Sequence, residues 1–129
     1  MILNKLGESL EDYLETLLLL EAKGRIRCVD VAKTMNVSKP SVNKAMKVLK
    51  EKGYVEQETY GDIFLTQEGR EIAKEVLLRH ETVSKFLIEV LGISEAVAEE
   101  DACHIEHALS DETFLKLKKF TEAYLKGDS

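Results

Sequence analysis

The segment that most limits the fold is residues 28–53, where two predicted helices lie only a few residues apart. Residues 28–35 have the apolar spacing of a short helix. Asn36 then marks a tight turn, and Ser38, with a proline two residues later, marks the start of a longer helix that Gly53 ends. Two helices joined by so short a turn predict a helix-turn-helix.

A helix precedes this pair and a β-hairpin follows it. Apolar residues at helical spacing begin after Ser9, which we expect to start the first helix. Two short strand-like runs, residues 54–58 and 63–65, flank a turn that contains a glycine. This order of elements predicts a winged helix-turn-helix over residues 1–66.

The remainder, residues 67–129, is predicted to be helical. Thr66 caps a long helix that reaches about Leu91, and Ser94 and Ser110 each begin one more. The expected fold class is therefore mostly α, with a winged helix-turn-helix domain followed by an α-helical domain. No apolar run approaches the roughly 20 residues of a membrane-spanning helix, and no signal-peptide pattern is present, so we expect a cytoplasmic protein without membrane contact.

Charge is distributed unevenly along the chain. The formal net charge is −6, but residues 23–53 hold nine Lys or Arg residues against two acidic residues, which gives that window +7 and leaves −13 for the rest. Local positive charge decides whether a surface attracts phosphate. The window coincides with the predicted helix-turn-helix, so its charge favours nucleic acid as the partner.

A helix that enters the major groove reads base edges with its N-terminal side chains. Hydroxyl and amide groups there could read bases, lysines could hold phosphates, and the wing at residues 59–62 could touch the adjacent backbone. A lysine-rich helix face is more often merely solvated, but the order of elements and the local charge agree on DNA. The residues expected at the DNA are Ser38, Lys39, Pro40, Ser41, Asn43, Lys44 and Lys47.

A second constellation lies in the C-terminal half. Cys103, Glu106 and His107 stand at positions i, i+3 and i+4, so they share one face of a predicted helix. Thiolate, carboxylate and imidazole are all groups that transition metals accept. A buried cysteine beside a surface Glu–His pair would have the same spacing, and both interpretations remain open at this level.

Other candidate ligands have equally ordinary explanations. Asp12 and Glu15 lie one turn apart near the start of the first helix, where acidic residues are favoured on electrostatic grounds alone. His80 lies on the apolar stripe of the long helix, where a core role is common. Glu99 could be an extra ligand or a solvated residue, and His104 points away from the trio.

The winged helix, the Ser-Leu-Glu-Asp-Tyr-Leu segment at residues 9–14 and the Cys-His-Ile-Glu-His segment at residues 103–107 resemble the metal-dependent repressors of the diphtheria toxin repressor family. The short type, similar to the manganese transport regulators, fits best, and the resemblance covers about residues 9–125. It implies a homodimeric, metal-activated transcriptional repressor that binds a double-stranded DNA operator and controls Mn or Fe uptake genes. Residues 67–129 would then form the metal-binding and dimerisation domain.

The resemblance also assigns the ligands. The matched metal positions are Asp12, Glu15, His80, Cys103, Glu106 and His107. Cys103 matches a position that is cysteine in iron-type and glutamate in manganese-type members, whereas Asp12 matches the manganese type. Ser84 replaces an acidic ligand of the iron type's ancillary site. The mixed set implies Mn²⁺ or Fe²⁺, with Zn²⁺ and Co²⁺ as alternatives.

Two other functions fit parts of the sequence. A winged-helix regulator could sense an organic ligand or the redox state through Cys28 or Cys103, without any metal. A small metal-dependent hydrolase could use Glu15 or Glu106 as general base, but the sequence has no HExxH motif or phosphate-binding loop and its basic helix would be unexplained. We therefore expect no enzymatic activity.

Overall fold

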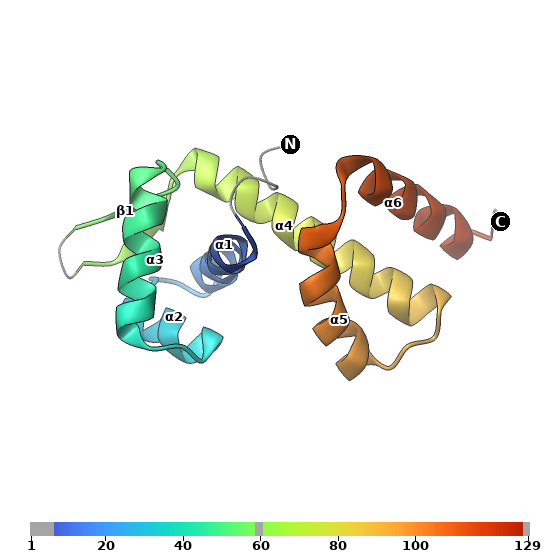
Figure 1. Cartoon of the computed structure of the whole chain (residues 1–129), viewed down its shortest axis with the longest axis horizontal. Helices are drawn as coiled ribbons and strands as arrows, with labels where there is room; N and C mark the ends of the chain where they lie inside the picture. Colours follow the sequence, from blue (N-terminus) through green and yellow to red (C-terminus); the bar gives the residue numbers. More distant parts are fainter. Residues whose placement is uncertain (1–6, 59–60, 128–129) are drawn as a thin grey trace. The chain divides into compact units, whose positions relative to one another are not determined.

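The computed structural model describes residues 7–58 and 61–127, and it is predominantly helical, as expected. Its helices are α1 (Glu8–Glu21), α2 (Cys28–Met35), α3 (Lys39–Glu51), α4 (Gln67–Lys85), the π-helix η2 (Phe86–Val90), α5 (Glu95–Ala108) and α6 (Asp111–Leu125), and its strands are β1 (Val55–Gln57) and β2 (Ile63–Leu65) (Figure 1).

The chain forms two compact units that divide between Glu75 and Val76, inside α4. We call them the N-terminal and the C-terminal unit. The functional boundary predicted between residues 66 and 67 lies at the start of α4, so this helix contributes its first turns to the N-terminal unit.

In the N-terminal unit, α1, α2 and α3 pack against one another, and α3 also contacts β1. Leu14 and Leu17 of α1 are completely buried. The apolar stripe of α3 faces this core, because Val42, Ala45, Met46 and Leu49 are all buried. One face of α3 is thereby fixed in the core, and the opposite face is left for solvent.

The local signals around α3 are also confirmed. Asn36 adopts the left-handed conformation, with φ 55° and ψ 50°, and so ends α2. Ser38 is the N-cap of α3, and its hydroxyl accepts a hydrogen bond of 3.2 Å from the Ser41 N–H. The start predicted for the first helix is wrong by one residue, because α1 begins at Glu8 after Gly7, whose φ of 87° suits glycine.

The wing is a two-stranded antiparallel sheet in which Val55 pairs with Leu65 and Gln57 with Ile63. The Ile63 N–H donates to the Ile26 carbonyl at 2.9 Å, which ties the hairpin to the segment after α1. Thr59 and Tyr60, in the predicted turn, lie outside the described residues.

In the C-terminal unit, η2 contacts both α5 and α6. A core of Val83, Leu87, Ala98 and Ala102 joins the end of the long helix to α5. The helix predicted to run to about Leu91 is continuous, but its last residues form the π-helix η2, a departure that periodicity does not reveal.

Buried Arg79 links α4 to the junction between α5 and α6. Its guanidinium donates to the Leu109 carbonyl at 2.8 Å and to Asp111 at 2.7 Å, and it lies 4.8 Å from the ring centroid of Phe114. Because Arg79 precedes His80, this clamp fixes the part of α4 that carries one of the predicted metal ligands.

Over residues 7–58 and 61–127, the structure contains no helix that combines the length and apolarity needed to cross a membrane.

The tight packing at Gly69 predicts that a larger residue there would destabilise the protein. The Thr66 hydroxyl caps α4 by accepting from the Gly69 N–H at 3.0 Å, and it donates to the Gly53 carbonyl at 2.7 Å. A Cβ on Gly69 would overlap the Tyr54 carbonyl oxygen, which is backbone and cannot rotate away. Gly69→Ala should therefore lower the free energy of unfolding by about 2 kcal/mol, although Gly→Ala in an open helix stabilises by about 1 kcal/mol.

Urea unfolding followed by circular dichroism measures this difference. Glu75→Ala, at an exposed position of the same helix, is the matched control and should change stability little. A Gly69→Ala protein as stable as the wild type would contradict the close approach of Tyr54 to α4.

Candidate metal centre and DNA-reading surface

The C-terminal unit brings His80 of α4 to the trio on α5. His80, Cys103 and Glu106 offer ligand atoms that all lie within 4.8 Å of one another. His107 completes the group, since its Nε2 lies 3.2 Å from Glu106 Oε1. Helical spacing predicts that the α5 residues share a face, but only the packing of α4 against α5 places His80 beside them. We call these four residues the C-terminal cluster.

Glu106 is the centre of this cluster. Its side chain is 1% exposed, and its second oxygen, Oε2, lies 3.1 Å from His80 Nδ1. Cys103 Sγ lies 3.9 Å from the same His80 nitrogen. His80 therefore turns Nδ1, rather than Nε2, toward the thiol and the carboxylate.

The electrostatics of Glu106 suit a cation. A buried carboxylate is costly unless positive charge or hydrogen bonds compensate it. Within the described residues, neither Glu106 oxygen accepts a hydrogen bond of good geometry, so its contacts with His80 and His107 are ion pairs at best. Burial alone raises the pKa of Glu106, but the attraction of His107 and His80 outweighs it and holds that pKa below its usual value.

The donor set therefore fits a divalent transition metal. A thiolate, a carboxylate and the His80 imidazole converge on one place, and His107 contacts the other oxygen of the same carboxylate. The carboxylate oxygens are buried acceptors without well-directed donors. Asp12 and Glu15 lie one turn apart on α1, in the N-terminal unit, and their membership of a metal site stays a prediction.

Sequence reasoning left the role of Glu99 open and drew no role from Ser84. Glu99, on α5, accepts a short hydrogen bond from the Ser84 hydroxyl, and its other oxygen lies 2.7 Å from His80 Nε2. The hydrogen bond from Ser84 and, next, the interaction with His80 lower the pKa of Glu99. The only available sequence signals are that Glu99 is one helical turn before Cys103 and Ser84 one turn after His80.

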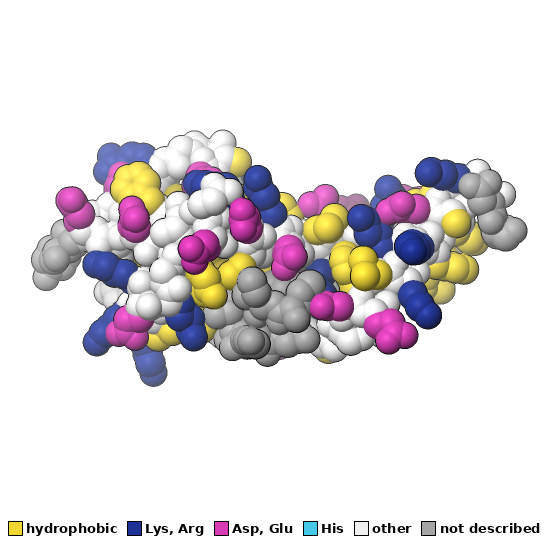
Figure 2. All heavy atoms as spheres, turned by 90° about the horizontal axis from the view of Figure 1, so that it is seen from above, with side chains coloured by type: hydrophobic (Ala, Val, Ile, Leu, Met, Phe, Trp, Pro, Cys, Tyr) yellow, Lys and Arg dark blue, Asp and Glu magenta, His cyan; other side chains and the backbone are white. Residues whose placement is uncertain are grey.

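The predicted DNA-reading residues share the solvent-facing side of α3 and its N-cap. All of them are exposed: Ser38, Lys39, Pro40, Ser41, Asn43, Lys44 and Lys47. A surface hollow of about 730 Å³ lies beside them, and its lining includes Lys39, Asn43 and Lys47, the segment residues Arg25, Arg27 and Cys28, and residues of the wing. In Figure 2, Lys and Arg side chains lie on both units, interspersed with Asp and Glu side chains.

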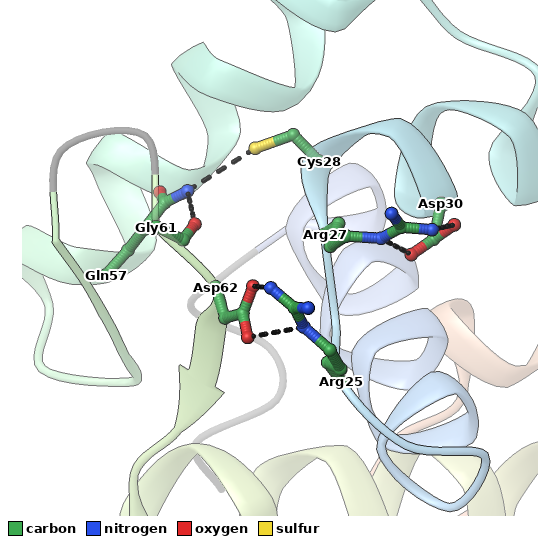
Figure 3. A network of polar contacts seen from close by, with 7 residues as sticks. All are labelled: Arg25, Arg27, Cys28, Asp30, Gln57, Gly61 and Asp62. Atoms are coloured by element: carbon green, nitrogen blue, oxygen red, sulfur yellow. Dashed lines mark hydrogen bonds and ion pairs between the residues drawn. The ribbon is translucent and has the colours of Figure 1, made fainter.

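Part of the local positive charge is neutralised internally. Arg25 donates to both carboxylate oxygens of the wing residue Asp62 at 2.9 Å, and Arg27 pairs with Asp30 at 3.0 and 3.3 Å (Figure 3). Lys50 donates to the Gln57 carbonyl at 2.9 Å and so braces the wing. The sum of +7 already counts Asp30, so only the pairing of Arg25 with Asp62, which lies outside the window, lowers the local charge further. The charge available to phosphates rests mainly on the lysines of α3.

A polar chain connects the wing to the recognition helix. Gln57 of β1 donates to the Gly61 carbonyl at 3.0 Å and to the Cys28 sulfur at 3.4 Å (Figure 3). The Cys28 thiol in turn donates to Asn43 Oδ1 at 3.5 Å. Cys28 and Gln57 therefore orient one of the predicted base-reading side chains, a role that their positions in the sequence do not disclose.

A winged helix-turn-helix with an exposed basic helix, in a chain that also carries a thiolate–carboxylate–imidazole cluster, defines a metal-responsive DNA-binding regulator. Two protein-family models match this chain, and both agree with this class. Residues 5–63 match "Iron dependent repressor, N-terminal DNA binding domain", and residues 66–125 match "Iron dependent repressor, metal binding and dimerisation domain". The chain belongs to the iron dependent repressor family.

Several relatives are similar over most of their length. The chain is 42% identical over 121 residues to an HTH-type transcriptional regulator of Methanocaldococcus jannaschii, covering 92% of this chain and 97% of that one. It is 38% identical over 118 residues to the transcriptional regulator MntR of Escherichia coli O6:H1, covering 91% and 76%. With the HTH-type transcriptional regulator MntR of Bacillus subtilis it shares 32% identity over 122 residues, covering 94% and 85%.

Solved structures show the same fold. The manganese regulator SloR matches with a TM-score of 0.77 and 29% identity, over 88% of this chain and 53% of that one. A manganese-dependent transcriptional repressor in complex with manganese matches with a TM-score of 0.78 and 25% identity, over 88% and 52%. This chain thus spans about half the length of these two structures.

The predicted class is therefore confirmed. The chain is a metal-dependent transcriptional repressor with a DNA-binding domain and a metal-binding and dimerisation domain, and its cofactor is a divalent metal such as Mn²⁺ or Fe²⁺. Its partners are a DNA operator and a second copy of itself.

Lys47→Ala tests the α3 surface. Loss of one phosphate contact should weaken binding to all DNA sequences alike and reduce the slope of log K against log salt by about one unit. The measurement is fluorescence anisotropy of the Mn²⁺-loaded protein on operator and on unrelated DNA at several salt concentrations. Lys119→Ala, an exposed lysine of α6, is the charge-matched control. An unchanged slope for Lys47→Ala would remove Lys47 from the phosphate-binding surface.

Proposed function

We propose that this repressor responds to metal through a site formed by Asp12, Glu15, His80, Cys103, Glu106 and His107, and that it controls Mn or Fe uptake genes. The observation that carries the proposal is the C-terminal cluster, whose ligand atoms converge around the buried Glu106 carboxylate. The same chain carries the exposed basic helix α3, so one polypeptide holds both the metal site and the DNA-binding surface.

Within the C-terminal unit, each ligand has a definite part. His80 offers Nδ1, Cys103 its thiolate and Glu106 a buried carboxylate, while His107 approaches Glu106 from the same helix. A bound divalent cation would supply the positive charge and the directional bonds that these donors require. Arg79 holds α4 to the junction after α5 and so keeps His80 near the other donors.

Asp12 and Glu15 would supply hard carboxylate oxygens from α1. Their support is chemical and comes from the resemblance: two carboxylates one turn apart are suitable Mn²⁺ or Fe²⁺ ligands. Ligands drawn from both units would favour one arrangement of the two recognition helices in a dimer. Operator half-sites lie about 34 Å apart or at a multiple of this distance, so metal would shift the population toward the spacing that binds DNA.

The choice of metal reflects opposed ligand preferences. Cys103 is soft and favours Fe²⁺, Zn²⁺ or Co²⁺, whereas the carboxylates are hard and favour Mn²⁺ or Fe²⁺. The manganese-bound repressor among the similar structures supports Mn²⁺.

We assign residues 1–66 to DNA binding and residues 67–129 to metal binding and dimerisation. Large apolar side chains exposed on the C-terminal unit support its role in the dimer: Leu78, Leu91, Val97, Leu115, Phe120, Tyr124 and Leu125. The relatives are transcriptional regulators, which supports a protein without enzymatic activity that acts on DNA in the cytoplasm.

His107→Ala tests the metal-linked switch. Removing one imidazole from the cluster should abolish metal-stimulated DNA binding and leave a folded dimer. Binding to the protein's own promoter region is measured anaerobically with Mn²⁺, Fe²⁺, Zn²⁺ and no metal, and circular dichroism and sedimentation report the fold and the dimer. His104→Ala, on the exposed side of the same helix, is the matched control.

A His107→Ala protein that responds normally to metal would contradict the site. Wild-type protein that binds the promoter equally well without metal would instead favour a metal-independent regulator that senses an organic ligand or the redox state.

Cys103→Glu tests the thiolate ligand. Replacing a soft thiolate with a hard carboxylate should lower the Mn²⁺ concentration for half-maximal DNA binding and raise the Zn²⁺ concentration, each by about tenfold if about 1.4 kcal/mol of preference is exchanged. Wild-type protein with Co²⁺ should show a thiolate-to-metal charge-transfer band that Cys103→Glu loses. Absence of the band in the wild type, with an unchanged metal ranking in the variant, would make Cys103 a packed thiol.

A further inference from the structure

Three polar side chains on the outer side of the C-terminal cluster form a connected chain. Ser84 lies one turn after His80 on α4, and Glu99 lies one turn before Cys103 on α5. The Ser84 hydroxyl donates to Glu99 Oε1, and Glu99 Oε2 lies 2.7 Å from His80 Nε2. All three belong to the C-terminal unit, so their geometry depends on one compact body.

The two ring nitrogens of His80 face different partners. Nδ1 lies 3.1 Å from Glu106 and 3.9 Å from Cys103, on the side of the cluster, whereas Nε2 faces Glu99. A neutral imidazole that ligates a metal through one nitrogen carries its proton on the other, and the acceptor of that proton fixes both the tautomer and the ring orientation.

We infer that Glu99 is a positioning residue for the metal site: it accepts the Nε2 proton of His80 and holds Nδ1 toward the cluster, while Ser84 holds Glu99. This inference rests on the metal role proposed for His80. Glu99 is then not a direct ligand, although it is an acidic residue only one helical turn away from Cys103.

The hydroxyl of Ser84 indicates that Glu99 orients His80 and is not itself a metal ligand. A second carboxylate at position 84 would repel Glu99, and a proton or a cation would have to offset that repulsion. A serine hydroxyl instead donates to Glu99 and leaves its other oxygen for His80. Ser84 and His80 thus engage both Glu99 oxygens, which is the arrangement expected of a group that orients a ligand.

The test compares Glu99→Gln, Ser84→Ala and Glu100→Gln in the full-length chain. Glu100 is the exposed neighbour of Glu99, and its substitution removes the same charge. Zn²⁺ affinity is measured by competition with a chromogenic chelator, and bound zinc per chain by elemental analysis.

We expect Glu99→Gln to weaken Zn²⁺ binding about 10- to 100-fold with an unchanged number of ions per chain. A glutamine amide that turns its N–H toward Nε2 would favour the His80 tautomer that has its proton on Nδ1. Ser84→Ala should weaken binding less, and Glu100→Gln should match the wild type. Loss of one zinc per chain in Glu99→Gln would make Glu99 a ligand, and unchanged affinity would make it a solvated residue; either result overturns the inference.

A second measurement needs no Glu99 variant. In ¹⁵N NMR spectra of the Zn²⁺-loaded wild type, His80 should have its proton on Nε2 and the metal on Nδ1, and the reverse assignment overturns the inference. His80→Ala identifies the signals and separates the two hypotheses. If His80→Ala lowers Zn²⁺ affinity while Glu99→Gln does not, only the positioning role fails. If His80→Ala has no effect on affinity, the proposed metal site and the positioning role both fail.

Discussion

The arrangement of the C-terminal unit depends on one buried carboxylate, that of Glu106, whose negative charge neighbouring groups must compensate. Glu106 is almost fully shielded from water, and an ionised side chain there is stable only beside positive or polarisable groups. His80 and His107 approach its two oxygens, one from α4 and one from α5 itself. The same demand for positive charge makes the place suitable for a cation.

The surroundings of that carboxylate are built to hold its partners. Arg79 fixes α4 to the junction beyond α5 through the Leu109 carbonyl and Asp111. Glu99 faces His80 from the side opposite to Glu106. Arg79 therefore fixes the position of His80 along α4, and Glu99 fixes the orientation of its ring. A selective metal site requires ligands that are pre-organised in this way.

On the N-terminal unit, the division of α3 into two faces governs recognition. Its apolar side is committed to the core, so its lysines and its amide are displayed to solvent. The ion pairs Arg25–Asp62 and Arg27–Asp30 shape the flank of this surface rather than add to its charge. In a chain of net charge −6, a short basic helix is enough to attract DNA because electrostatic attraction decays over about 8 Å at physiological salt.

The sequence by itself determined the features that act within one or two helical turns. The Ser38 cap, the Asn36 turn, the inner stripe of α3 and the shared face of Cys103 and Glu106 follow from local backbone hydrogen bonding and helical periodicity. The resemblance of these segments to known repressors supplied the function that local patterns left open.

Only the tertiary structure determined the contacts between residues of different helices and strands. His80 and Cys103 are 23 positions apart and Arg25 and Asp62 are 37 apart, so nothing in their local pattern states that they meet. The overlap that forbids a side chain on Gly69, the π-helix at the end of α4 and the contact of Glu99 with His80 arise in the same way. Such contacts depend on how helices pack, and packing is settled by the shape and volume of the whole core rather than by the spacing of residues along one helix.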